Sequence, residues 1–436
     1  MRTVTESAPG LRQHLNARQL TVAGVGTILG AGIYALIGEA AAQGGEYTWL
    51  SFVVAAVVAA FTGLSYAELA AMFPNAGAGY AYALRAFGDD VAFVTGWLTI
   101  TGSIIAAAAV ALGFGSYLRV LGGPDPVVGA ILLLAAGVLI AGSGVLGSVS
   151  IVSILTAVEA GGLLLVVVIG FGDFDAGHLA GGSPAGAIFG GAALVFFAYI
   201  GFEDMATFSE EARDPERTMP RAILAALAIT TLLYVVVTVA SLGAIGADAL
   251  AASDVPLATV AELALHENAG DVLAWIALAA TANTTIILLM AAGRMVYSMA
   301  RSGTLPPFLG KVHGVSGVPF RGLVAVAVPA ALMALWGDIG AVADTTNFVL
   351  FCAFGVVNAA VISLRVREPG LARPFRSPGV VPFRGHRFPV FPLLAIASLG
   401  VLLFSLGTSS ILGGAAVLTL GVVLAWLFRG KREHAE

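Results

Sequence analysis

Charged residues are scarce in this chain of 436 amino acids, at 11% against about 25% in an average soluble protein. Cysteine is scarcer still, because Cys352 is the only one, which excludes an intramolecular disulfide and a cysteine-based metal site. The six histidines all fall in predicted loops or tails, and no basic patch suggests a nucleic-acid partner. We therefore expect no metal, no cofactor and no nucleic acid, and these shortages argue against an enzyme within the membrane.

Long apolar runs take the place of charge. Hydrophobic residues make up 58% of the chain, and twelve runs come near the roughly 20 residues that cross a bilayer as a helix. The sequence thus predicts an all-α membrane protein with twelve transmembrane helices and a lipid bilayer as its surroundings. The expected spans are 18–43, 47–72, 91–121, 127–141, 145–172, 185–209, 221–245, 272–301, 322–336, 339–364, 390–406 and 411–428.

The basic residues predict the orientation of these spans. With the amino terminus inside the cell, twenty of the twenty-one lysines and arginines lie on or near the cytoplasmic side, and only Arg119 lies outside. We expect a multi-pass protein of the cytoplasmic (inner) membrane with both termini inside. Its expected parts are a cytoplasmic tail at 1–17, a helical core at 18–364, a Pro/Arg-rich cytoplasmic connector at 365–389, a helix pair at 390–428 and a cytoplasmic tail at 429–436.

Two of the predicted spans are interrupted. The run "GVGTILGAGIYALIG" at 24–38 holds five glycines, and in the sixth span Gly201 is followed by the acids Glu203 and Asp204. Glycine disfavours a helix and an acid is costly in hydrocarbon, so each interruption indicates a broken helix. Because these two spans run in opposite directions, they predict an inverted repeat of helices 1–5 and 6–10 with a substrate between them.

A broken helix offers amide N–H groups from one half and carbonyl oxygens from the other. Donors and acceptors at that separation suit the carboxylate and ammonium of an α-amino acid. The alternative is that the glycines at 24, 26, 30 and 32 are small packing positions between helices.

Four stretches carry a resemblance to a known family. "GTILGAGIY", "FPNAGAGYAYALRAFG", "FFAYIGFEDMATFSEEARDPERTMPRAI" and "RMVYSMARSGTLPPFLGKV" resemble, in order, motifs of the amino acid–polyamine–organocation transporters. The chain is most similar to the bacterial amino acid permeases near the cationic amino acid transporter-like branch. The resemblance implies a leucine-transporter-type fold with a five-plus-five inverted repeat, broken helices 1 and 6, and alternating access.

The resemblance also implies a substrate site. The substrate carboxylate would meet the N–H groups of Ala31 and Gly32, which follow Gly30 in the glycine motif. Its amine would meet the carbonyl oxygens of Ile28, Phe197 and Ile200. Phe197 would also cover the substrate as an aromatic gate, or else it is an ordinary packed aromatic residue.

Three acids inside the spans receive separate interpretations. Glu203 matches a position linked to gating or proton coupling, or it makes a structural hydrogen bond to a neighbouring helix. Asp204 would point about 100° away on an α-helix and is expected to cap or pair elsewhere. Glu159, in "ILTAVEAGGLLLVVV", stands where several relatives carry a lysine that replaces a bound sodium. It could hold a proton, a metal cation or a cationic substrate, or pair with a neighbour.

These observations predict a secondary active transporter, not an enzyme. Its expected substrate is an amino acid or related amine, and its expected mechanism is symport with a proton or another coupling ion. Exchange without proton coupling is the alternative, and a channel or an intramembrane enzyme is more remote. Backbone groups recognise what amino acids share, so the motifs leave the side chain of the substrate open.

Overall fold

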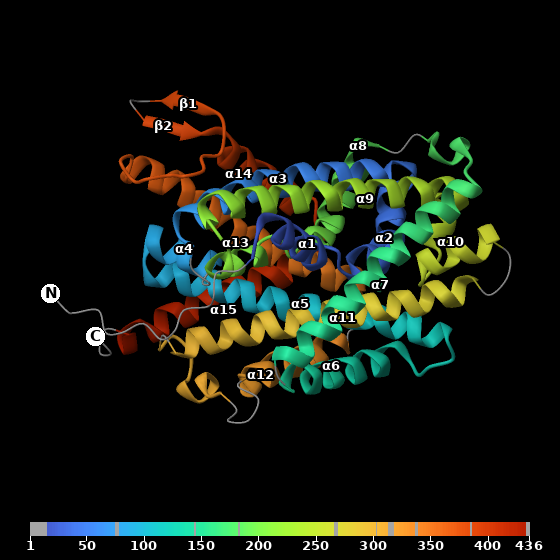
Figure 1. Ribbon diagram of the computed structural model, residues 1–436, viewed down its shortest axis with the longest axis horizontal. Coiled ribbons are helices and arrows are strands. Elements are labelled where there is room, and N and C mark those ends of the chain that lie inside the picture. Colours follow the sequence, from blue (N-terminus) through green and yellow to red (C-terminus); the bar gives the residue numbers. More distant parts are fainter. Residues whose placement is uncertain are drawn as a thin grey trace.

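The computed structural model is a bundle of long helices that run mostly along one direction (Figure 1). It describes residues 15–74, 78–143, 145–181, 184–265, 269–301, 303–312, 318–335, 339–383 and 386–432. The elements are α1 (Ala17–Ile28), α2 (Ala31–Gly44), the 3₁₀ helix η1 (Gly45–Tyr47), α3 (Thr48–Met72), α4 (Ala78–Phe87), α5 (Asp89–Val120), α6 (Pro126–Gly142), α7 (Val145–Gly172), η2 (Ala176–Leu179), α8 (Ala185–Val195), η3 (Phe196–Tyr199), η4 (Asp204–Glu211), α9 (Pro215–Ala251), α10 (Pro256–Leu265), α11 (Ala269–Arg301), η5 (Pro307–Gly310), α12 (Phe320–Ala334), α13 (Ile339–Arg367), β1 (Val380–Phe383), β2 (His386–Pro389), α14 (Val390–Phe404) and α15 (Thr408–Arg432).

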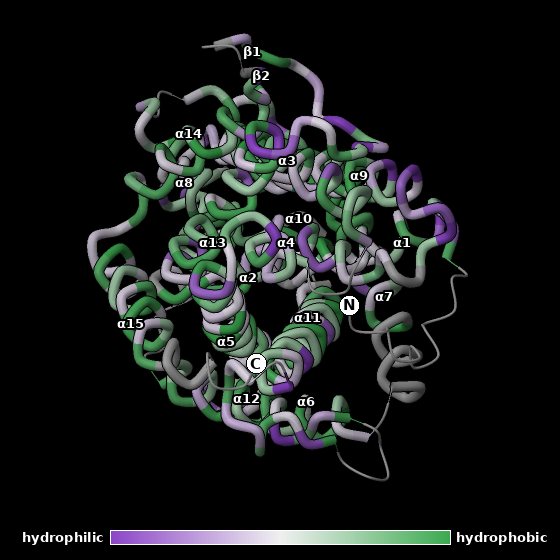
Figure 2. The backbone as a smooth tube through the Cα atoms, turned by 90° about the vertical axis from the view of Figure 1, so that its left-hand side faces the viewer, coloured by the Kyte–Doolittle hydropathy of each residue, from purple (hydrophilic) through white to green (hydrophobic). Residues whose placement is uncertain are grey.

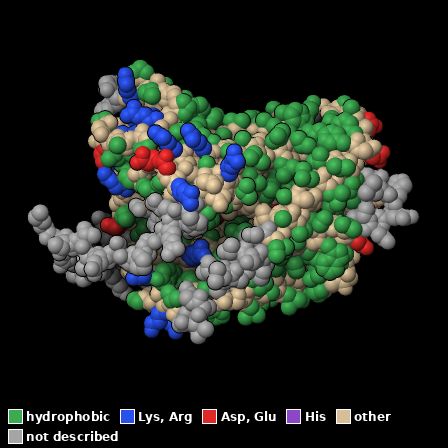
Figure 3. Space-filling model, viewed as in Figure 1, with side chains coloured by type: hydrophobic (Ala, Val, Ile, Leu, Met, Phe, Trp, Pro, Cys, Tyr) green, Lys and Arg blue, Asp and Glu red, His purple; other side chains and the backbone are tan. Residues whose placement is uncertain are grey.

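The outer faces of the helices are apolar. Large side chains such as Phe404, 83% exposed, and Trp426, 73% exposed, point away from the bundle, and hydrophobic atoms cover most of the visible face in Figure 3. Seen along the bundle in Figure 2, hydrophobic residues follow most of the helices, and hydrophilic ones gather at the near end. Lipid accommodates such a surface and water does not. The chain is therefore a multi-pass membrane protein.

The helices follow the predicted spans closely, but the count of crossings stays a prediction. Within the described ranges, eight helical stretches are long and apolar enough to cross a membrane, while α6, α12 and α14 are apolar but shorter. The first predicted span is divided between α1 and α2, and the sixth between α8, η3 and η4. The loops also contain the short helices α4 and α10, which the sequence pattern did not predict.

The core is built around α5, which packs against α11, α13 and α6. Alanines 106 to 109 of α5 are all fully or almost fully buried, and such small residues let neighbouring backbones approach closely. On the other side of the bundle α3 packs along α9. These contacts place the two broken helices between the α3–α9 pair and the α5–α11 pair.

The predicted connector has a structure of its own. It contains the antiparallel hairpin of β1 and β2, in which Val380 lies opposite Pro389, and α14 begins at the next residue. The predicted amino-terminal tail lies outside the described residues up to position 14. At the other end α15 continues to Arg432, so the first four residues of the predicted carboxy-terminal tail are helical.

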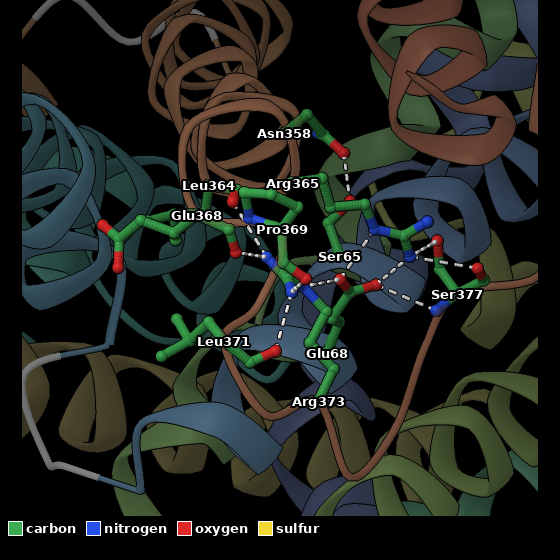
Figure 4. A network of polar contacts seen from close by, with 10 residues as sticks. All are labelled: Ser65, Glu68, Asn358, Leu364, Arg365, Glu368, Pro369, Leu371, Arg373 and Ser377. Carbon is green, nitrogen blue, oxygen red and sulfur yellow. Dashed lines mark hydrogen bonds and ion pairs between the residues drawn. The ribbon is translucent and has the colours of Figure 1, made fainter. Parts of the chain in front are cut away.

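An ion cluster ties this connector to the bundle (Figure 4). The carboxylate of Glu68, on α3, accepts hydrogen bonds from Arg365 through Nε at 2.9 Å and through a second guanidinium nitrogen, and from the Ser377 amide at 2.9 Å. Arg373 lies 3.7 Å from the same carboxylate and donates to the carbonyl oxygens of Leu364 and Leu371. We call Glu68, Arg365, Arg373 and Ser377 the Glu68 cluster. All four side chains are buried or nearly so.

Candidate functional site

The first helix break lies between α1 and α2. Leu29 and Gly30 separate the two helices, with φ and ψ of −62° and 88° at Leu29 and −118° and 178° at Gly30. These angles are open to many residue types, so the break does not itself require glycine. The first N–H groups of α2 have no carbonyl partner within the helix, and the residue at its N-cap, Gly30, has no side chain to cap them.

The second break does require glycine. Between η3 and η4 the chain turns at Gly201, whose φ of 116° lies in the region that side chains disfavour. A Cβ atom at this position would also collide with the carbonyl oxygen of Thr27 in α1. Glu203 stabilises the turn, because its Oε2 accepts a hydrogen bond from the Gly201 amide at 2.9 Å. The sequence offered a hydrogen bond to a neighbouring helix as the structural role of Glu203. The hydrogen bond that the structure shows instead lies within its own turn, to the Gly201 amide.

The other glycines allow the two breaks to touch. A Cβ atom on Gly32 would lie 2.7 Å from the Cα of Ala198, so α2 and η3 meet backbone to backbone. On Gly26 it would lie 2.9 Å from Cγ2 of Thr156 on α7. Gly26 and Gly32 therefore do serve close packing between helices, as the alternative interpretation of the glycines expected. They also lie next to the helix breaks, where backbone N–H and carbonyl groups lack partners within a helix.

A cavity of about 30 Å³ lies where the breaks meet, which is more than one water molecule requires. Five of the six predicted substrate residues line it. They are Ile28, Gly30, Gly32, Phe197 and Ile200. Ala31, the sixth, begins α2 between two of these lining residues. The structure thus brings the predicted substrate residues together; their role in binding stays a prediction.

Two of the three carbonyl oxygens expected to meet an amine, those of Ile28 and Phe197, already accept one hydrogen bond each. The Tyr234 hydroxyl donates to the Ile28 carbonyl at 2.8 Å, and the Ile200 amide donates to the Phe197 carbonyl at 3.2 Å. Because a carbonyl oxygen accepts two hydrogen bonds, each retains one lone pair. Phe197 is 6% exposed and is part of the cavity lining.

Glu159 lies away from the cavity, between α7 and α11. It is fully buried, and its Oε2 lies 3.4 Å from the amide nitrogen of Asn283, which also donates to Thr156 at 3.0 Å. Among the described residues, its Oε1 has no hydrogen-bond partner, and the same holds for the Asn283 side-chain oxygen. One bond reaches α2, from the Tyr34 hydroxyl to the Glu159 backbone carbonyl at 2.8 Å. Since Glu159 does not line the cavity, it is poorly placed to pair directly with a cationic substrate.

Asp204 is the residue whose position the sequence interpretation got wrong. It was expected to point away from the site, but it lines the cavity. The 100° step holds along an α-helix, whereas the chain here turns at Gly201 and continues as the 3₁₀ helix η4. The available signal was Gly201 itself, because helical spacing cannot be carried across a break.

Comparisons with known proteins agree with this architecture. The amino acid permease family model matches residues 15–428. The methylthioribose transporter of Bacillus subtilis is 29% identical over 447 residues, covering 98% of this chain and 95% of that protein. The branched-chain amino acid permease BcaP of the same organism is 30% identical over 455 residues, covering 99% and 96%.

A plant relative is also similar over most of the chain. The vacuolar cationic amino acid transporter 4 of Arabidopsis thaliana is 30% identical over 387 residues, which is 82% of this chain and 64% of that protein. The family match spans nearly all of the sequence, from just before α1 to a point within the last turns of α15. The chain therefore belongs to the amino acid permease family of the amino acid–polyamine–organocation superfamily, and it is a membrane transporter rather than an enzyme.

Proposed function

We propose that the protein is a proton-coupled symporter that moves an amino acid or related amine across the cell membrane by alternating access. One observation carries the proposal: the uncapped amino terminus of α2 and the carbonyl ends of α1 and η3 border a single cavity. The amino end of a helix attracts a carboxylate, and free carbonyl lone pairs accept from an ammonium. The proposed substrate therefore binds with its carboxylate at Ala31 and Gly32 and its amine near Ile28, Phe197 and Ile200.

The packing of the helices supports alternating access. The heaviest contacts join α3 with α9 and α5 with α11, which are the second and seventh and the third and eighth predicted spans. In a five-plus-five inverted repeat these are the pairs that the repeat relates to one another. Such a repeat can rock about the site and expose it to either side in turn.

Glu159 is the proposed proton carrier. Its surroundings offer one long hydrogen bond from a neutral amide, and within the described residues no lysine, arginine or histidine forms an ion pair with it. Burying an unpaired carboxylate is costly, whereas a proton on Oε1 would remove the charge and turn an unpaired acceptor into a donor. If Glu159 releases that proton when the site opens to the other side of the membrane, the movement of protons is coupled to the movement of substrate.

The experiment is uptake into liposomes that contain the purified protein. We expect radiolabelled amino acid or amine to accumulate when the outside is more acidic than the inside, and accumulation to collapse when a protonophore is added. Exchange without coupling would instead show stimulation by substrate on the far side and no response to pH. Flux that neither saturates nor shows such stimulation would indicate a channel, and a chemically altered product would indicate an enzyme.

A further inference from the structure

Asp204 places a carboxyl group in the cavity wall, although the backbone groups of the two breaks can bind the carboxylate and ammonium common to all amino acids without it. Of the thirteen described residues that line the cavity, Asp204 alone has an ionisable side chain. The wall otherwise includes apolar side chains from three helices and the second break, among them Ala106, Phe197, Ile200, Ile287 and Leu288. A carboxylate in such a wall is costly unless a positive charge or several donors compensate it.

The protein does not provide that compensation in the part of the chain that is described. There Asp204 has no ion pair and no side-chain hydrogen bond, and the Thr207 hydroxyl donates only to its backbone carbonyl. The adjacent acid behaves differently, because Glu203 is held by the Gly201 amide. Two neighbouring carboxylates thus have separate roles: one closes the turn, and the other lines the cavity.

We propose that Asp204 selects substrates that bring a positive charge beyond that of a zwitterion, such as a basic amino acid or an amine without a carboxylate. The inference rests on the proposed transport function and names the charge class of the substrate. A zwitterion balances its own charges at the backbone groups and leaves Asp204 uncompensated. A cationic substrate neutralises Asp204 with its additional ammonium, while its methylene chain lies along the apolar wall of Ile287 and Leu288.

The test is equilibrium binding of L-lysine and putrescine, compared with L-leucine, to the purified wild-type protein and Asp204→Asn. We expect the wild type to bind the two cations at least tenfold more tightly than leucine. In Asp204→Asn the affinity for the cations should fall at least tenfold, as when one partner of a desolvated charge pair is removed, and leucine binding should persist. Asp214→Asn is the matched control, because it removes the same charge from a side chain that is 58% exposed outside the cavity.

Asp204→Glu keeps the charge and should keep the preference for cations, which separates loss of charge from loss of fold. Size-exclusion profiles of each variant report whether it is folded. Equal affinity of the wild type for lysine and leucine would overturn the inference, even if Asp204→Asn does not fold. So would an unchanged preference in a folded Asp204→Asn. Failure of all amino acids and amines to bind would instead contradict the proposed function.

Discussion

Gly30 and Gly32 stand two residues apart and meet different neighbours. A methyl group on Gly32 would press on the backbone of Ala198, which cannot move without separating the two breaks. On Gly30 it would lie 3.1 Å from Oγ1 of Thr284, a side chain that also lines the cavity and can give way by a few tenths of an ångström. The same substitution therefore tests packing at one position and binding at the other.

We expect Gly30→Ala to fold normally and to bind substrate more weakly, because the added methyl group crowds the cavity. Overpacking costs about 1–3 kcal/mol, which corresponds to roughly 5- to 150-fold in affinity. Gly32→Ala should lower the melting temperature as well. Thermal unfolding and equilibrium binding of both variants provide the measurement, and full affinity in Gly30→Ala would exclude the proposed site beside α2.

Glu159→Gln should separate binding from coupling. Glutamine resembles the protonated acid in shape and keeps the position beside Asn283, so substrate should still bind and exchange. Uptake should lose its dependence on a pH gradient, and accumulation should fail, because no proton can be released. Parallel assays of equilibrium binding and gradient-driven uptake test this. Wild-type behaviour in both would leave Glu159 as a buried acid without a role in coupling.

At this scale the sequence predicted most of the candidate site, in that the expected residues line the cavity, but it did not predict the charge there. The glycine motif and the acids after Gly201 located both breaks, and five of six predicted residues line one cavity. Asp204 was misplaced because its direction depends on the turn at Gly201 and on a 3₁₀ continuation. Gly201 signals that the helix breaks, but no local pattern reports the direction that a side chain takes after the break.

At the scale of elements, apolar runs predict helices well because burial in lipid favours a fully hydrogen-bonded backbone. Outside the bilayer, the same apolar runs do not predict which structure a polar segment adopts. The connector was expected only to be polar, yet it forms a hairpin and supplies Arg373 and Ser377 to the Glu68 cluster. Arg365 bonds to Glu68 across 297 positions in the sequence, and a contact at that separation leaves no periodic signal.

The Glu68 cluster should matter more for stability than a comparable pair on the surface. Glu68→Gln removes the carboxylate that Arg365 and Arg373 share while both guanidinium groups stay buried, so we expect the free energy of unfolding to fall by about 3–5 kcal/mol. Glu368→Gln is the control, because Glu368 pairs with Arg85 while both side chains are 35–45% exposed, and such pairs contribute about 0–1 kcal/mol. Thermal unfolding in one detergent would compare them, and equal effects would contradict the expected difference.

At the scale of the whole molecule, charge and apolar surface divide the protein along its length. Basic side chains gather at the end that carries the hairpin, and the visible acids lie at the two ends, while the surface between is mainly hydrophobic (Figure 3). By the positive-inside rule, we expect the end that carries the hairpin to face the cytoplasm. The test is access of a protease or a thiol reagent to tags on the two termini, in sealed cells and in inverted vesicles. We expect both tags to be reached only in the inverted vesicles. Access to either tag from outside sealed cells would contradict the predicted orientation.

The long separation between Glu68 and Arg365 also has a consequence in time. A ribosome adds about 5–20 residues per second, so the 297 residues from Leu69 to Arg365 take roughly 15–60 s to synthesise. During that interval α3 can be in the membrane while the arginines that will neutralise its acid do not yet exist. The cluster can close only after α13 and the connector have been made, which makes it a late step of biogenesis. A chain arrested before the connector would hold an unpaired acid near the end of α3, and that acid would distinguish an unfinished protein from a complete one.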